Sequence, residues 1–288
     1  MPARAPRLLL VDNGSLEPAA TLNLRRISAE LSAQLGSVVE PVSLLHSDKV
    51  PAEALDGIPA VTFEPWLRRR VAEGERDFIV LPLFFGPSGA ITDYLPSRVE
   101  LVRAAEPSLR VCVAPELAAP GGGEERIAAM LQDRALESIA ALSSDGMGGR
   151  PALILVDHGS PKPELGALRD RLAARLSSAL GERVRAVCAA SMERREGAAY
   201  DFNEPLLERA FALPDFDHGV VVVSLLFLSP GRHAGPGGDI ARICRSAAEA
   251  HAGLRPYMTG LLGDHPGLVR LLADRARVLL ADNEQPMA

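Results

Sequence analysis

The sequence has little of what marks a nucleic-acid-binding, membrane-bound or disulfide-bonded protein. Positive charge is not in excess, because 31 lysines and arginines are opposed by 37 acidic residues, for a net charge of −6. We therefore expect no nucleic acid and no membrane as partner. The three cysteines, Cys112, Cys188 and Cys244, are far apart and form no CxxC pair. They are interpreted as buried free thiols in a reducing compartment.

Long apolar runs are also absent. No segment reaches the length of a membrane-spanning helix, and the run near the N-terminus, RLLLV, is too short for the apolar core of a signal peptide. We therefore expect a cytoplasmic protein. The phosphate-binding pattern GxxxxGK[ST] does not occur either, so the sequence gives no sign of ATP-dependent chemistry.

The chain does contain an internal repeat. RLLLVDNGS at 7–15 matches ALILVDHGS at 152–160, FIVLPLFFGPSG at 78–89 matches VVVSLLFLSPGR at 221–232, and LRVCVAPEL at 109–117 matches LRPYMTGLL at 254–262. The matches keep their order at offsets of 143–145 residues, which indicates an internal duplication. We predict one repeat at 1–142, a polar, glycine-rich linker at 143–150, and a second repeat at 151–288.

Within each repeat, short apolar runs alternate with helical patterns. The predicted strands are 7–12, 38–45, 78–85 and 110–115 in the first repeat, and 151–157, 184–190, 219–228 and 254–260 in the second. The clearest helical patterns cover 19–36, 91–106 and 164–181. This alternation predicts two tandem three-layer α/β/α domains with mainly parallel sheets. In such folds ligands bind at the carboxyl ends of the strands.

Three predicted strands of the second repeat end in residues that can carry chemistry. The first is followed by His158, the second by the run MERREG with Glu193, and the third by a glycine-rich loop with Arg232, His233 and Asp239. If the three strands are neighbours, two imidazoles and a carboxylate converge. Such a set suits a divalent transition metal, and it could also exchange protons with a substrate.

Each of these features also has a plainer interpretation. A lone histidine at a strand end is most often a hydrogen-bonded turn residue, MERRE alone is typical of a solvated turn, and SPGRHAGPGG of a flexible loop. The remaining histidines lie outside the group and are interpreted as surface or local structural residues: His46, His218, His251 and His265.

Taken together, the motifs DHGSP, SMERREG…FNEPLLE and FLSPGRHAGPGGDI resemble the class II chelatases. These enzymes insert Co²⁺ or Fe²⁺ into sirohydrochlorin, and their long members are tandem copies of one α/β unit. The resemblance implies that His158 and His233 bind the metal and take up pyrrole protons, with Glu193 as the acidic residue of the site. It implies no permanently bound cofactor, because the divalent metal is a substrate. We expect cobalt to be preferred over iron, although histidine and carboxylate ligands suit cobalt, iron and nickel alike.

The resemblance also implies residues that bind the tetrapyrrole. Sirohydrochlorin is rich in carboxylates, so Arg194, Arg195 and Arg232 are expected to hold it. Ser160 and Gly231, beside the two histidines in sequence, are expected to contact it as well.

The first repeat lacks the histidines. Asn13 is the counterpart of His158, and His233 aligns near Ala90, whereas the 145-residue offset places Asp48 opposite Glu193. We therefore expect the first repeat to be a scaffold that forms the opposite wall of a cleft and retains one acidic residue.

A non-catalytic carrier of a tetrapyrrole or a metal is the alternative. It would suit the degenerate first repeat and the lengthened third loop, in which five residues separate His233 from Asp239 where family members usually have three. The survival of both histidines in one repeat favours the enzyme. Two similar lobes would also suit a periplasmic-type ligand-binding protein, but the sequence shows no export signal. A chain with two repeats can build its cleft internally, so we expect a monomer.

Overall fold

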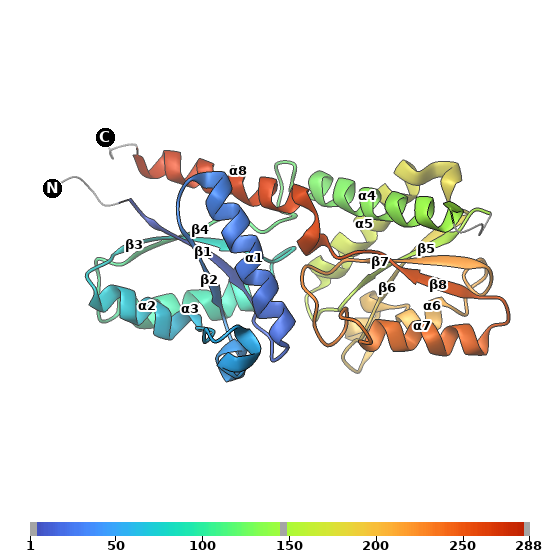
Figure 1. Cartoon of the computed structure of the whole chain (residues 1–288), viewed down its shortest axis with the longest axis horizontal. Coiled ribbons are helices and arrows are strands. Elements are labelled where there is room, and N and C mark those ends of the chain that lie inside the picture. The colour runs from blue at the N-terminus through green and yellow to red at the C-terminus, as the bar shows by residue number, and fades with distance from the viewer. Residues whose placement is uncertain (1–4, 145–148, 285–288) are drawn as a thin grey trace. The chain divides into compact units, whose positions relative to one another are not determined.

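Each sequence repeat forms a four-stranded parallel sheet (Figure 1). The structure, a computed structural model, describes residues 5–144 and 149–284. In the first sheet the strand order is β2-β1-β3-β4, with β1 Arg7–Asp12, β2 Val39–Ser43, β3 Asp77–Pro82 and β4 Arg110–Val113. In the second sheet the order is β6-β5-β7-β8, with β5 Ala152–Asp157, β6 Ala186–Ser191, β7 Val220–Leu225 and β8 Arg255–Met258. The predicted fold class is confirmed.

Helices cover both faces of each sheet, which explains why the central strands are continuous apolar runs. On the first sheet, α1 (Pro18–Leu35) lies beside α8 (Pro266–Glu284), and α2 (Phe63–Ala72) and α3 (Leu95–Arg103) pack on the other face. On the second sheet, α4 (Gly123–Ser144) and α5 (Pro163–Leu180) cover one face. The short α6 (Leu207–Ala210) and α7 (Asp239–Ala250) cover the other face.

The compact units do not coincide with the sequence repeats. One unit runs to Gly123 and is completed by α8, and the other comprises Glu124–His265 and therefore begins with α4. Each unit thus takes the helix that ends the other repeat. In the predicted linker 143–150, the first two residues still belong to α4, and 145–148 lie outside the described residues.

Side-chain hydrogen bonds attach each exchanged helix to its unit. In the first unit Arg275 of α8 donates to the carbonyl of Pro115 at 2.6 Å. In the second unit Arg134 of α4 donates to the carbonyl of Leu261 at 3.2 Å. Within the described residues, no helix combines the length and apolarity that crossing a membrane requires.

The cysteines are free, but they are not all buried. Cys244 is buried and Cys188 is partly buried, and burial raises the pKa of both thiols to about 12. Cys112 is exposed, so the prediction of a buried thiol is wrong there. It lies on β4, which is an edge strand of the first sheet and is therefore less covered than the central strands.

The strands β1 and β5 each end in a buried aspartate, and among the described residues only Asp157 has a cation beside it. Asp157 lies 3.8 Å from the guanidinium of Arg169, whereas the corresponding helix position in the first unit is Leu24. Burial raises the pKa of Asp12 to about 6, and a hydrogen bond from Ser43 opposes the shift only in part.

Replacing Asp12 by asparagine is expected to stabilise the protein at neutral and alkaline pH, by up to about 3 kcal/mol. The folded-state pKa of about 6 lies above the ordinary value of 3.8. A charged Asp12 therefore opposes folding above pH 6, and this opposition disappears as the pH falls through 6 toward 4. Urea unfolding of both proteins at about pH 8 and about pH 4 measures the effect. If the two proteins differ in free energy of unfolding by the same amount at both pH values, the charge of Asp12 is not the cause of the stabilisation.

Candidate functional site

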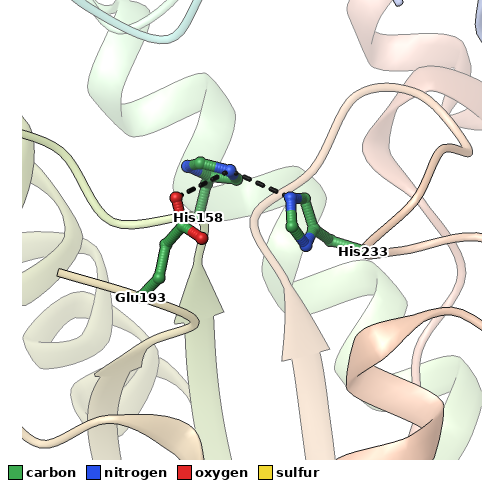
Figure 2. Close-up of side chains that lie close together, drawn as sticks. All are labelled: His158, Glu193 and His233. Carbon is green, nitrogen blue, oxygen red and sulfur yellow. Dashed lines mark hydrogen bonds and ion pairs between the residues drawn. The ribbon is translucent and has the colours of Figure 1, made fainter. Parts of the chain in front are cut away.

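His158, Glu193 and His233 meet at the carboxyl ends of three neighbouring strands (Figure 2). His158 directly follows β5, Glu193 follows β6 by two residues, and His233 lies in the loop between β7 and α7. The two Nε2 atoms are 3.1 Å apart, and His158 Nε2 lies 3.6 Å from a Glu193 carboxylate oxygen. The predicted convergence of these three residues is therefore present in the structure.

The three side chains offer donor atoms that one metal ion could share. One donor atom from each residue lies within 4.8 Å of the other two, and no other such group of three occurs in the described part of the chain. Two nitrogens 3.1 Å apart can both reach one ion at the usual metal–nitrogen distance of about 2.1 Å. His158 and Glu193 are half exposed or more, at 50% and 62%, so an incoming ion can reach them.

Backbone hydrogen bonds past the ends of the strands hold Glu193 beside His158. The amide of Met192 donates to the carbonyl of Asp157 at 2.9 Å, and the amide of Glu193 donates to the carbonyl of His158 at 3.2 Å. Gly159 makes this approach possible: its φ is 89°, and a Cβ there would lie 1.9 Å from the carbonyl oxygen of Glu193. The glycine of DHGSP is therefore a requirement of the site's backbone.

Alanine at Gly159 is expected to destabilise the protein by about 1–3 kcal/mol and also to weaken Co²⁺ binding, because Glu193 must move. Gly14 of the first unit provides a matched control, with a φ of 84° and a Cβ position 1.7 Å from the carbonyl oxygen of Leu45. Gly14→Ala should lose similar stability and keep the Co²⁺ affinity. Urea unfolding and Co²⁺ titration measure the two quantities separately, and an equal loss of affinity in both variants would contradict the assignment.

A buried polar network lies directly beneath the site. Ser191 Oγ donates to Asp157 Oδ1 at 2.6 Å, and Arg169 donates to Ser191 Oγ and to the carbonyl of Phe202. The Arg169 side chain is only 1% exposed. Burial raises the pKa of Asp157, while Ser191 and Arg169 act against the rise. Arg169 was not predicted from the sequence; the available signal was an arginine in an amphipathic helix at the position where the first repeat has Leu24.

The loop after β7 is attached to the start of α7, which places His233. The amides of Asp239 and Ile240 donate to the carbonyls of Arg232 and His233, both at 3.1 Å. A Cβ at Gly238 would lie 2.7 Å from each of these two carbonyl oxygens, so only glycine fits. Although the loop is long, it brings Asp239 Oδ2 to 2.8 Å from His233 Nδ1.

The electrostatics of His233 favour its neutral form. Burial lowers the pKa of this ring, the neighbouring His158 lowers it further, and Glu193 partly opposes the shift. A neutral ring keeps a nitrogen lone pair, which can bind a metal ion or accept a proton.

A cavity of about 690 Å³ opens beside His233 and Glu193. Its lining continues along α7 and includes Arg232, Arg242 and, at the far end, His251. His251 was interpreted as a surface or local structural residue, yet it lines the same cavity as the candidate site. Arg242 was not singled out from the sequence, and its position three residues after Asp239 on a helix was the only signal.

The three arginines predicted to bind substrate differ in their surroundings. Arg194 is 19% exposed and bound to Asp201 at 2.5 Å and Glu204 at 3.1 Å, so its guanidinium closes the loop that follows β6. Arg195 is exposed, and its guanidinium lies 5.8 Å from the centre of an aromatic ring. Arg232 is 78% exposed and lines the cavity.

Ser160 and Gly231 both make local turns in this structure. Ser160 donates its amide to Asn203 Oδ1 at 2.9 Å, and its hydroxyl accepts the amide of Lys162 at 3.0 Å, which leads the chain into α5. The carbonyl of Gly231 accepts the amide of Gly235 at 2.8 Å within the His233 loop. These contacts give both residues a role in loop shape.

Leu45, rather than Asp48, is the structural counterpart of Glu193 in the first unit. The amide of Leu45 donates to the carbonyl of Asn13 at 3.1 Å. In the second unit, the amide of Glu193 donates to the carbonyl of His158 in the same way. The prediction from the constant offset is therefore wrong at this strand. The chain between α5 and β6 contains an extra turn, Gly181–Arg183, so the offset is larger here. With Asn13 and Leu45 in place of His158 and Glu193, the first unit has no equivalent of this part of the site.

Known proteins share both the fold and part of the sequence. Sirohydrochlorin ferrochelatase, chloroplastic, of Arabidopsis thaliana is 30% identical over 145 residues, which cover 50% of this chain and 59% of that protein. The chain thus spans little more than half of this relative.

Two solved structures match nearly the whole chain. SirB from Bacillus subtilis with Fe³⁺ has a TM-score of 0.68 at 17% identity, with 98% of both chains covered. The sirohydrochlorin chelatase SirB from Bacillus subtilis subspecies spizizenii in complex with cobalt has a TM-score of 0.66 at 16% identity, covering 98% of this chain and 97% of that one. At such identities the matches establish the fold.

The profile of the CbiX family matches residues 7–138 and again 152–279. The two matches correspond to the two sequence repeats and together cover most of the chain. The predicted resemblance to the class II chelatases is confirmed, and the chain belongs to the CbiX family.

Proposed function

We propose that this protein inserts a divalent metal, Co²⁺ or Fe²⁺, into sirohydrochlorin. The observation that carries the proposal is the pair of Nε2 atoms 3.1 Å apart, with a carboxylate beside them, in a chain of the CbiX family. The similarity to a sirohydrochlorin ferrochelatase and to a sirohydrochlorin chelatase supports it.

In the proposed reaction His158, His233 and Glu193 first hold the incoming ion. The ring must lose its pyrrole N–H protons as it accepts the metal. His233 is suited to take one, because its lowered pKa leaves the ring neutral near pH 7. Glu193 is 62% exposed and close to His158, so its carboxylate can take another.

The tetrapyrrole would be held through its carboxylates. Both Arg195 and Arg232 are exposed; Arg232 lines the cavity beside the site, and Arg195 lies two residues after Glu193 in the sequence. A guanidinium can bind a carboxylate through two parallel hydrogen bonds. Arg194 is better assigned to shaping its own loop, because acidic partners already occupy it.

An absorbance assay with sirohydrochlorin and either Co²⁺ or Fe²⁺ tests the proposal. Metallation of the ring changes its spectrum, and the rate is compared with the protein-free reaction. Acceleration by either metal supports the proposal. The ratio of the two rates decides between cobalt and iron, and both metals occur among the similar proteins named above. Tight binding of the ring without acceleration would instead identify a carrier.

A further inference from the structure

Asp239, the first residue of α7, lies between His233 and two arginines. Its Oδ2 is 2.8 Å from His233 Nδ1 and 3.4 Å from Arg232 Nε, and its Oδ1 accepts a hydrogen bond from Arg242. The carboxylate is only 16% exposed, whereas the side chains of Arg232 and Arg242 are 78% and 62% exposed. One mostly buried anion is therefore surrounded by an imidazole and two solvent-facing cations.

The position of Asp239 determines which nitrogen of His233 can bind a metal. A carboxylate oxygen attracts a proton on Nδ1 and repels a lone pair there, so the proton is held on Nδ1 and the lone pair is on Nε2. Nδ1 is buried and makes no hydrogen bond, and Asp239 Oδ2, at 2.8 Å, is the acceptor beside it. On the opposite ring, Nδ1 of His158 lies 3.1 Å from the carbonyl oxygen of Gly159, which can only accept. With Nδ1 protonated on both rings, the two Nε2 lone pairs, 3.1 Å apart, would be available to an ion bound between them.

The charges around Asp239 leave a place for an anion. Two guanidinium groups share one carboxylate, so the group of three has a net positive charge, and both arginines line the cavity along α7. Three acidic residues line the cavity: Asp239 itself, Glu193, which faces the histidines, and Glu208. Arg232 and Arg242 therefore form the cationic part of this wall.

We propose that Asp239 is a positioning residue that acts through His233, and that Arg232 and Arg242 bind a carboxylate side chain of the tetrapyrrole in the cavity along α7. The proposal rests on the proposed metal insertion and extends it, because it assigns an orienting group to the metal site and a location to part of the substrate. Since the same two arginines contact Asp239, the substrate carboxylate would bind next to the group that orients His233.

Asp239→Asn tests the first half, with Co²⁺ alone as the probe. The variant keeps the shape of the side chain and removes its charge, so we expect Co²⁺ affinity to fall by about 10–100-fold and the visible spectrum of bound Co²⁺ to change. Asp217→Asn is the matched control, because Asp217 Oδ1 lies 2.6 Å from Nδ1 of His218 in an exposed pair outside the cavity. NMR of the imidazole nitrogens in the metal-free protein reads the ring tautomer of His233 directly. Wild-type affinity, spectrum and tautomer in Asp239→Asn would overturn the assignment.

Arg242→Gln tests the second half, with sirohydrochlorin as the varied substrate at fixed Co²⁺. We expect KM for the ring to rise by about tenfold, as for the loss of a charge-assisted hydrogen bond, while the affinity for Co²⁺ alone stays within about twofold. Arg245→Gln is the control, since Arg245 is exposed on the same helix but does not line the cavity. Arg242→Lys should restore part of the loss. An unchanged KM in Arg242→Gln would overturn this half.

These results separate the inference from the proposed function. If the wild-type protein fails to metallate the ring, the proposed function is wrong, but the Co²⁺ affinity and the tautomer still decide the role of Asp239. If the wild-type protein is active and Asp239→Asn and Arg242→Gln match it in every readout, only the inference fails.

Discussion

Alanine at His158 or at His233 is expected to reduce metal insertion by about 10³-fold or more, which is the largest effect on activity that the structure predicts. Each substitution removes one of the two nitrogens that are 3.1 Å apart, and with it one metal ligand and one proton acceptor of the proposed reaction. Both rings lie at the surface end of the strands, with 50% and 21% of their side chains exposed, so stability should change by less than about 1 kcal/mol. The absorbance assay and urea unfolding of the same preparations measure the two effects.

Asn13→Ala provides the matched control for His158→Ala. Asn13 follows β1 as His158 follows β5, and its amide cannot replace an imidazole as a proton acceptor near neutral pH. The variant should therefore keep the wild-type rate. Full activity in both histidine variants, or an equally large loss in Asn13→Ala, would rule out the assignment of the site to the second repeat.

Arg169→Leu is expected to cause the largest loss of stability, about 3–5 kcal/mol. The substitution introduces leucine, the residue found at the corresponding position 24 of the first repeat. It leaves Asp157 and Ser191 buried without their cation. A carboxylate in that position is costly, because burial already raises its pKa in the presence of the arginine. Since His158 directly follows Asp157, the affinity for Co²⁺ should fall as well.

Two further variants isolate the buried charge as the cause. Arg171→Leu removes an arginine from the same helix that is 55% exposed, and its partner Glu124 keeps Arg175, so the free energy of unfolding should change by no more than about 1 kcal/mol. Adding Asp157→Asn to Arg169→Leu should restore part of the lost stability, because the unpaired charge is then gone. If Arg169→Leu unfolds like the Arg171 variant, the network does not have the proposed energetic role.

The site could be predicted from sequence because its parts follow from local patterns. Continuous apolar runs specify buried parallel strands, and polar residues directly after such runs lie at one edge of the sheet. His158, Glu193 and His233 each follow a predicted strand, so their convergence required only that the three strands be neighbours. The order β6-β5-β7 satisfies that condition.

The charged residues near the site could not be assigned in the same way. Arg194 was expected to face the substrate, but it is closed into its own loop by Asp201 and Glu204. Arg169, by contrast, was not predicted to be near the site, yet its side chain is buried directly beneath it. The partner of a long, flexible side chain depends on which acidic groups the fold brings within its reach, and sequence spacing does not contain that information.

By itself the sequence determined the duplication, the parallel α/β fold and the three residues of the candidate site, because apolar periodicity and strand-end residues are local properties of the chain. Only the tertiary structure decided which unit receives α4 and α8, that Leu45 rather than Asp48 corresponds to Glu193, and that Asp239 reaches His233 across a longer loop. These features depend on loop length, on hydrogen-bond register and on packing between segments far apart in the chain. Such interactions are formed only when the whole unit has folded.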